Sequence, residues 1–164
     1  AAAYTIRRFG LRDTVVQLTE AWNHMAVHAY GHTVELKPHA KAYLSKLRQC
    51  GARLAVATSA PAALYGLALG RHGITHFFDA ICTTDEVGHG KTRPDVFLLA
   101  ARRLGQRPEN CVVFEDILEA VQSAKSAGMT VYGVYDPASH SSWDAINKAA
   151  DGALTSFQDA PLPA

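Results

Sequence analysis

Short apolar runs alternate with segments of helical spacing from about residue 38 onward. The apolar runs cover residues 54–58, 80–83, 111–115 and 131–135, with a last short extended piece near residue 153. Between them, residues 39–49, 62–72, 95–104, 118–127 and 142–149 repeat apolar positions every three or four residues. Strands that are apolar throughout and alternate with helices are typical of parallel sheets buried on both faces. The pattern therefore predicts a doubly wound, mostly parallel α/β fold with right-handed crossovers.

The first part of the chain has a different pattern, with helical spacing and no strand. Asp13 is suited to cap a helix that runs through the following apolar positions, and Gly31 is expected to end that helix. We expect residues 31–38 to form a linker, because Pro38 favours an extended backbone at Lys37. We expect an all-helical piece over residues 1–32 and the α/β part over residues 33–164.

Composition narrows the class of protein. The 164 residues are 48% hydrophobic, enough for a substantial core, and 16 Lys and Arg balance 15 Asp and Glu for a net charge of +1. A dedicated nucleic-acid binder is disfavoured, because it would show a clustered basic surplus. The 3 cysteines form no CxxC pair, and no apolar segment is long enough to span a bilayer. We expect buried free thiols and a cytoplasmic location, and the oligomeric state is open.

Two groups of polar residues lie after predicted strands, in positions where they could bind an anion. Thr58 and Ser59 close one strand and supply a hydroxyl and successive N–H groups before a helix, although an ordinary helix cap has the same residues. Lys91 follows glycines in a loop and could reach a phosphate, although a solvated surface lysine is the simpler explanation. Asp95 is expected to cap the helix behind this loop.

Adjacent carboxylates follow another predicted strand. Glu115 and Asp116 would repel one another unless a cation or a lysine lies between them, and oxygen ligands suit Mg²⁺. The alternative is that Asp116 serves as a helix N-cap. Asp136 follows the next strand before a proline, and a turn suffices to explain it.

Taken together, three motifs of the sequence resemble the haloacid dehalogenase-like hydrolase superfamily. They are ATS at 57–59, GKTRPDVF at 90–97 and FEDILEAVQSAKSAGM at 114–129. The resemblance is greatest to its phosphatases and β-phosphoglucomutases, which carry a helical cap on a Rossmann-like core. It implies that residues 1–32 are a remnant of that cap. It also implies that Thr58 binds the transferring phosphoryl group, Lys91 neutralises it, and Glu115 and Asp116 hold Mg²⁺.

The family's nucleophile is absent from the sequence. In relatives it is the first Asp of a DxDGT motif after the first strand, and no such motif occurs here. The resemblance places that first strand between the strands that end at Thr58 and at Glu115. We therefore expect a piece of a longer enzyme, inactive by itself, with a gap or an improvised pairing between those two strands.

The resemblance implies a phosphatase that acts through an aspartyl-phosphate on a small phosphorylated metabolite, and a sugar phosphate is the expected substrate. A β-phosphoglucomutase-like phosphomutase is an alternative within the family. The missing nucleophile also leaves open a non-catalytic module that binds a phosphorylated ligand. A receiver-like signalling domain is disfavoured, because its phosphoacceptor Asp on a middle strand is lacking.

A histidine stripe at His24, His28 and His32 has the i, i+4 spacing of a helical metal site. Gly31 argues against a continuous helix there, and no carboxylate or cysteine completes a ligand set. We therefore expect ordinary histidines and no transition metal.

Overall fold

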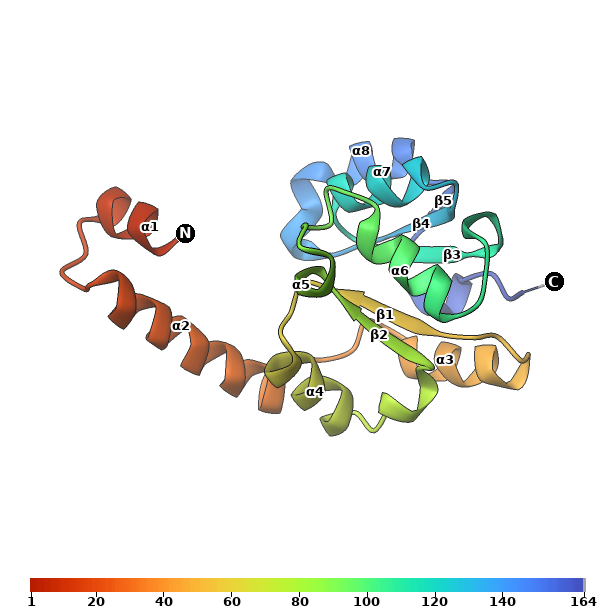
Figure 1. The fold of residues 1–164 in the computed structure, drawn as a ribbon, viewed down its shortest axis with the longest axis horizontal. Helices are drawn as coiled ribbons and strands as arrows, with labels where there is room; N and C mark the ends of the chain where they lie inside the picture. Colours follow the sequence, from red (N-terminus) through yellow and green to blue (C-terminus); the bar gives the residue numbers. More distant parts are fainter. Residues whose placement is uncertain (164) are drawn as a thin grey trace. The chain divides into compact units, whose positions relative to one another are not determined.

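The computed structural model describes residues 1–163 and forms two compact units. One unit contains Ala1–Glu35 together with Ala62–Gly73, and the other contains Leu36–Pro61 and the chain from Ile74 onward. The second unit holds the five strands found in the described residues, which are parallel and covered by helices on both faces, so the α/β prediction is confirmed (Figure 1). The predicted domain limits at residues 32 and 33 stay a prediction.

The first unit is helical, as predicted. It comprises α1 (Ala2–Phe9), α2 (Val15–His28), a π-helical turn (Ala29–Thr33) and α4 (Ala62–Arg71). Thr14, not Asp13, caps α2, because its hydroxyl accepts the N–H of Gln17 while the Gln17 side chain accepts the N–H of Thr14. The helix does not end at Gly31, since a wider turn carries it through to Thr33. The expected cap at Asp13 and the expected helix end at Gly31 were therefore both wrong.

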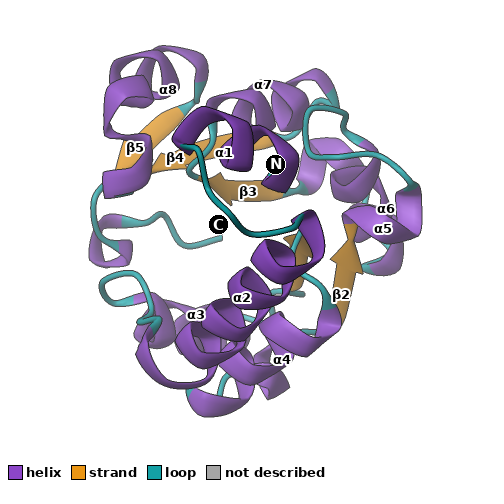
Figure 2. Ribbon diagram, turned by 90° about the vertical axis from the view of Figure 1, so that its left-hand side faces the viewer, coloured by secondary structure: helices purple, strands orange, loops and turns teal. Residues whose placement is uncertain are grey.

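The strands of the second unit form two separate sheets. β1 (Ala55–Thr58) pairs only with β2 (Ala80–Thr83), and β4 (Thr130–Val134) lies between β3 (Val112–Glu115) and β5 (Gly152–Leu154). Figure 2 shows β2 apart from β3, β4 and β5. No strand pairing joins β1 to β3 in the described residues. The predicted gap in the sheet is therefore confirmed.

Most helices of the second unit lie close to their predicted positions. These are α3 (Ala40–Gln49), α6 (Asp95–Arg103), α7 (Leu118–Ser126) and α8 (Trp143–Ala149). The short helix α5 (Thr84–Val87) was not predicted. Short 3₁₀ turns occupy Thr75–Phe77, Pro108–Asn110, Pro137–Ser142 and Phe157–Asp159. The N-terminal end of α6 has no side-chain cap, and Asp95 instead accepts hydrogen bonds from Arg93. The expected capping role of Asp95 is therefore wrong.

One apolar core lies between the sheets and helices α6, α7 and α8. Val96 of α6, Val121 of α7, Val131 of β4 and Ile146 of α8 are fully buried. Gly133 of β4 allows α8 to approach closely, because a Cβ there would lie 2.5 Å from the Ile146 Cγ2. Because α6 contacts both β1 and β2 and shares this core, it joins the two sheets without any strand pairing.

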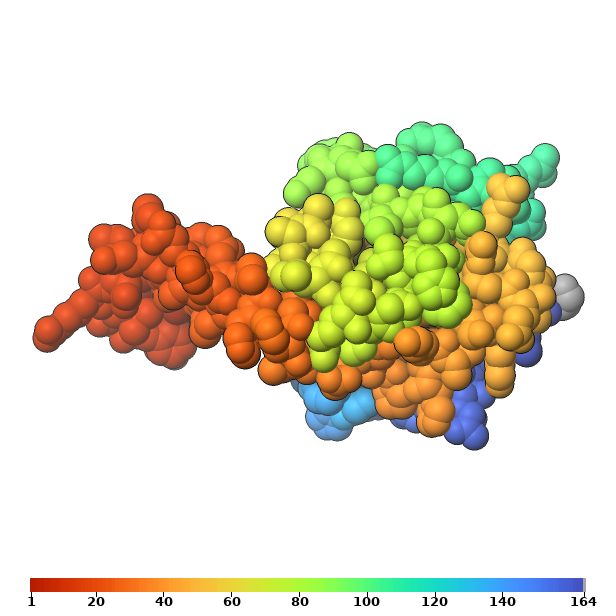
Figure 3. All heavy atoms as spheres, turned by 90° about the horizontal axis from the view of Figure 1, so that it is seen from below, coloured from red at the N-terminus to blue at the C-terminus, as the bar shows by residue number. Residues whose placement is uncertain are grey.

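An aromatic cluster covers the opposite face of the sheets. Tyr43 of α3 packs edge-on against Phe114 of β3, and Phe157 stacks on Tyr43. The Tyr43 hydroxyl donates to the Pro161 carbonyl oxygen at 2.5 Å. In Figure 3 the C-terminal residues, in blue, lie beside α3, in orange. The end of the chain is thus part of the packing on this face.

Candidate active site

The first predicted site residues lie where β1 ends. Thr58 is its last residue, and its hydroxyl oxygen accepts the N–H of Ala60 at 3.0 Å. This bond forms a tight turn that turns the chain from β1 toward α4. Ser59 lies within that turn. The hydroxyl and the backbone of the turn are thereby held at the carboxyl end of the strand, where parallel sheets bind ligands.

Lys91 and Glu115 form an ion pair at the ends of neighbouring elements. The Lys91 Nζ lies 2.8 Å from Glu115 Oε2, and the Glu115 side chain is only 3% exposed. The other oxygen of Glu115 accepts the N–H groups of Asp116 and Ile117, so no oxygen of this buried carboxylate lacks a partner. Lys91 is therefore no free surface lysine: the loop after α5 directs it toward the end of β3.

Asp116 has a different environment from Glu115. Its side chain is 34% exposed, and the residue at the helix N-cap is Ile117, so the alternative of a capping role is excluded. The Asp116 Oδ2 lies 3.5 Å from the Lys37 Nζ. The same Lys37 Nζ lies 2.7 Å from Asp136 Oδ2 and donates to the Tyr135 carbonyl oxygen. Lys37 thus links the carboxyl ends of β3 and β4.

Asp136 has both the predicted turn role and a role beyond it. Its Oδ1 accepts the N–H of Ala138 at 2.8 Å, which begins the 3₁₀ turn after β4. The hydrogen bond from Lys37, and to a lesser extent that from Ala138, holds the pKa of Asp136 below its usual value. Asp136 is therefore an ionised member of the polar group at this edge.

The donor set at this edge is compatible with a magnesium ion. Mg²⁺ commonly takes one or two protein carboxylates and keeps several waters. Asp116 offers a partly exposed carboxylate, whereas both oxygens of Glu115 are already hydrogen-bonded. Among residues 1–163, no group of three or more His, Cys, Asp or Glu side chains is placed to hold a metal by itself. Asp116 would hold the ion, which would supply positive charge next to a phosphate.

The structure brings some predicted site residues together and leaves others apart. Lys91, Glu115 and Asp116 form one contact network, while the bond recorded for Thr58 remains within its own turn. Lys37 was not predicted as a site residue, because it lies in the segment 31–38 that was predicted to be a linker. Its one sequence signal is the following proline, which fixes an extended backbone but says nothing about the charge partner.

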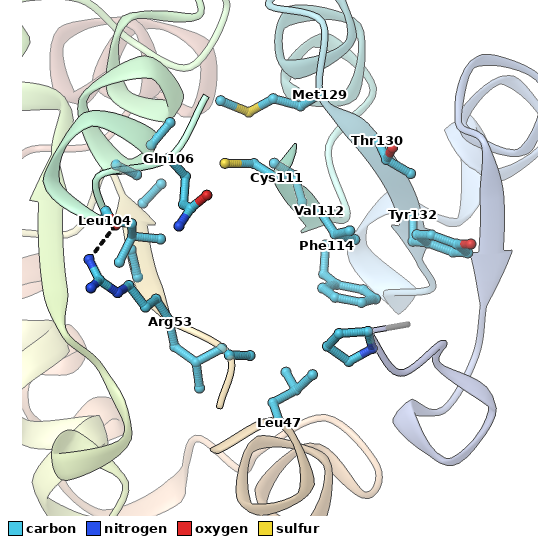
Figure 4. Close-up of a pocket in the computed structure, with 18 of the residues that line it drawn as sticks. Leu47, Arg53, Leu104, Gln106, Cys111, Val112, Phe114, Met129, Thr130 and Tyr132 are labelled. Atoms are coloured by element: carbon cyan, nitrogen blue, oxygen red, sulfur yellow. Dashed lines mark hydrogen bonds between the residues drawn. The ribbon is translucent and has the colours of Figure 1, made fainter. Parts of the chain in front are cut away.

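A large cavity begins beside these residues and runs between the two sheets. Its volume is about 830 Å³, and Ala57, Lys91 and Glu115 are among the residues that line it. Figure 4 shows Phe114, Leu47, Arg53 and other side chains arranged around its centre. The cavity is partly open to solvent and has polar as well as apolar lining residues, so water can enter it.

The histidine stripe and the cysteines are the remaining features that the sequence singled out. His28 and His32 stack at a centroid distance of 4.8 Å, and the described residues contain no three-ligand metal cluster. The cysteines are free, as predicted, but only Cys82 is fully buried, whereas Cys50 is exposed. None of the helices within residues 1–163 is both long and apolar enough to cross a membrane.

Comparison with known proteins decides the family. The model of the haloacid dehalogenase-like hydrolases matches residues 4–128, most of the chain. The chain belongs to the haloacid dehalogenase-like hydrolases. The match includes Thr58, Lys91, Glu115 and Asp116, whose motifs suggested the same family from the sequence.

Among curated relatives in this family are phosphatases of small metabolites. The chain is 43% identical over 81 residues to fructose-1-phosphate phosphatase YqaB of Escherichia coli, covering 49% of the chain and 43% of the relative. It is 30% identical over 125 residues to a phosphorylated carbohydrates phosphatase of Thermotoga maritima, covering 76% of the chain and 58% of the relative. The chain thus spans about half the length of these two relatives.

Two solved structures have a fold similar to that of this chain. CbbY from Rhodobacter sphaeroides, solved in complex with phosphate, is 26% identical with a TM-score of 0.78, covering 91% of this chain and 67% of CbbY. A β-phosphoglucomutase-like structure from Thermotoga maritima has a TM-score of 0.79 at 24% identity, covering 96% of the chain and 73% of that structure. The latter likeness supports the fold alone.

Proposed function

We propose that this chain supplies the phosphate-binding and metal-binding half of a Mg²⁺-dependent phosphatase. The observation that supports the proposal most directly is the Lys91–Glu115 ion pair beside the partly exposed Asp116. A buried carboxylate holds the lysine, which leaves its positive charge at the strand ends next to a carboxylate suited to Mg²⁺. Its substrate would be a small phosphorylated metabolite, as with the phosphatases named above.

The proposed chemistry is phosphoryl transfer to an aspartate that these 164 residues do not contain at the site. A carboxylate oxygen attacks phosphorus, the bond from phosphorus to the leaving oxygen breaks, and that oxygen takes a proton. Water then attacks the phosphorus of the acyl phosphate and releases phosphate and the free carboxylate. Lys91 and the turn after Thr58 would bind the phosphoryl oxygens, on which negative charge develops. The chain alone is therefore expected to be inactive.

Activity and binding assays test the two halves of this proposal. The 164-residue protein with Mg²⁺ should hydrolyse sugar phosphates no faster than buffer does. Hydrolysis well above that rate, and lost in Asp116→Asn, would show that another residue is the nucleophile. Calorimetry should show Mg²⁺ binding to the protein that Asp116→Asn abolishes, while the exposed Asp144→Asn, on α8, leaves it unchanged. Equal binding by both variants would contradict the metal assignment.

The coding sequence on the amino-terminal side of Ala1 provides a second test. An apolar strand followed in frame by the acidic nucleophile motif supports the phosphatase, and protein that includes it should hydrolyse sugar phosphates. Product analysis of that protein separates phosphatase from phosphomutase, since only the phosphatase releases inorganic phosphate. A start codon directly before Ala1 would instead favour a non-catalytic module that binds a phosphorylated ligand.

A further inference from the structure

We propose that two residues late in the chain are positioning residues that hold Lys37 in place at the candidate site. Ser156 and Phe157 contact Pro38 and His39, and these four residues are named the C-terminal clasp. The clasp stabilises a turn that begins at Lys37, so it sets how much positive charge reaches the carboxylates at the strand ends. Only its effect on Mg²⁺ binding rests on the function proposed above.

A turn fixes the backbone at Lys37, which belongs to neither a helix nor a strand. The Lys37 carbonyl oxygen accepts the N–H of Ala40 at 3.1 Å, which closes a turn with Pro38 second and His39 third. His39 has φ 63° and ψ 8°. A closing hydrogen bond, a proline at the second position and a positive φ at the third are the features of a type II turn. The position of Lys37 therefore depends on this turn.

His39 is an unfavourable residue for the third position of such a turn. Glycine is favoured there, because at positive φ a Cβ lies too close to the backbone. Within residues 1–163, His39 is the only residue other than glycine with a positive φ. A backbone conformation of this kind persists only where surrounding contacts stabilise it. The turn therefore needs contacts from outside itself.

The clasp supplies such contacts at two points of the turn. The His39 Nδ1 and the Ser156 Oγ share a hydrogen bond at 2.8 Å. The Pro38 carbonyl oxygen accepts the N–H of Phe157 at 3.0 Å. Ser156 is itself held, since its Oγ also accepts the N–H of Gln158 at 3.1 Å where the last 3₁₀ turn begins. The turn is thus stabilised by residues 117 positions away in sequence.

The aromatic cluster supports the clasp. The Phe157 ring stacks on Tyr43 of α3 at a centroid distance of 5.5 Å and lies 5.3 Å from the ring of Phe114 of β3. Tyr43 is buried. Because closely packed rings leave little room for displacement, Phe157 is a fixed point for the turn that it contacts. The clasp is therefore connected to the packed interior of the second unit.

Lys37 transmits the effect of the clasp to the candidate site. Its Nζ lies 2.7 Å from Asp136 Oδ2 and 3.5 Å from Asp116 Oδ2. Release of the turn would let this side chain leave both carboxylates. Asp136 would then lose the main cause of its lowered pKa. Asp116 would lose the positive charge that competes with a metal ion.

Two variants at His39 test the proposal, because the new residues differ by only a methyl group. Both His39→Ala and His39→Gly lose the hydrogen bond to Ser156, but only glycine adopts a positive φ without strain. Carbon-13 NMR titration should show the pKa of Asp136 raised toward its ordinary 3.8 in His39→Ala and unchanged in His39→Gly. Equal pKa values of Asp136 in the two variants would overturn the proposal.

Variants of Ser156 test the other side of the same hydrogen bond. Ser156→Ala should raise the pKa of Asp136 as His39→Ala does, because His39 keeps its Cβ but loses its partner. Adding His39→Gly to Ser156→Ala should restore the parent value, since a glycine turn does not need the clasp. Thr155→Ala, at the exposed neighbouring residue, should leave the pKa unchanged. A rise that His39→Gly does not reverse would indicate general loosening of the chain and contradict the proposal.

Mg²⁺ binding by the same variants separates this proposal from the phosphatase. In calorimetry, His39→Ala should bind Mg²⁺ about twofold more tightly than the parent, because Lys37 competes less, and His39→Gly should match the parent. If Asp136 responds as expected but the parent protein binds no Mg²⁺, the clasp stands and the metal assignment is refuted. If Mg²⁺ binds through Asp116 but the two variants do not differ in Mg²⁺ affinity or in the pKa of Asp136, the reverse holds.

Discussion

Lys91 Nζ and Glu115 Oε2 lie 2.8 Å apart, and the carboxylate is buried while the lysine is 21% exposed. Replacing Lys91 by Met would leave a buried negative charge with only backbone N–H partners. Removing one partner of a buried ion pair lowers the free energy of unfolding by about 3 kcal/mol. We expect urea unfolding of Lys91→Met to show this loss, and the double variant with Glu115→Gln to recover most of it.

A surface ion pair provides the control for that prediction. Arg93 and Asp95 are joined at 3.0 Å, but the arginine side chain is 58% exposed. Because solvent screens such pairs, Arg93→Met should change the free energy of unfolding by about 0.5 kcal/mol or less. Equal losses for Arg93→Met and Lys91→Met would show that the burial of Glu115 is not what makes its pair important.

Asp136 should respond to pH through Lys37. Its pKa is lowered from the ordinary 3.8, so its ionised form stabilises the fold above that value, and the contribution is lost as pH falls through the lowered pKa. Lys37→Met should raise the pKa of Asp136 toward 3.8. Carbon-13 NMR titration measures this. Asp151, whose pKa Lys125 lowers, should titrate unchanged. An unchanged Asp136 would show that Lys37 is not its main partner.

Gly133 limits how closely α8 can pack on β4. A methyl group there would meet the fully buried Ile146 side chain, which has no space to move away. Gly133→Ala should therefore destabilise the protein by about 1–3 kcal/mol in urea unfolding. Gly66→Ala, within α4 where nothing lies within 4 Å, should be neutral or stabilising by up to about 1 kcal/mol. The reverse order would contradict the packing argument.

Lys37 should compete with a metal ion at Asp116. Its Nζ lies 3.5 Å from the Asp116 carboxylate, where it supplies positive charge that Mg²⁺ would otherwise supply. Removing it in Lys37→Met should tighten Mg²⁺ binding about fivefold, equivalent to about 1 kcal/mol. Calorimetric titration measures the change, with Lys125→Met as a distant control. Weaker binding in Lys37→Met would show that the lysine assists the metal instead.

The strand-and-helix order of the second unit was predictable because each element has its own periodicity. The strand at 80–83 was predicted to the residue, and most other bounds differ by a single residue. The hydrophobic periodicity of a segment shows which of its residues are buried, so the element can be predicted without information on distant contacts. The gap between β1 and β3 was predicted from the family resemblance and not from the strands themselves, since both are as apolar as central strands.

The polar contacts were less predictable, because they depend on side chains far apart in sequence. Lys37 and Asp136 are separated by 99 positions, and neither has a local signal for the other. Lys91 could have been a surface lysine until Glu115 was found beside it. At Thr14 and Asp13 two adjacent residues could each cap a helix, and the side chain of Gln17 decides between them.

The backbone hydrogen-bond network of the second unit is divided at the cavity. Side-chain packing around α6 joins β1 and β2 to the other sheet, and packing alone does not require both parts to unfold together. The unit should therefore unfold in two cooperative steps. The β1–β2 pair, without a fully buried residue in β1, should open at a lower free energy than β4. A strand in the cavity would merge the two steps into one.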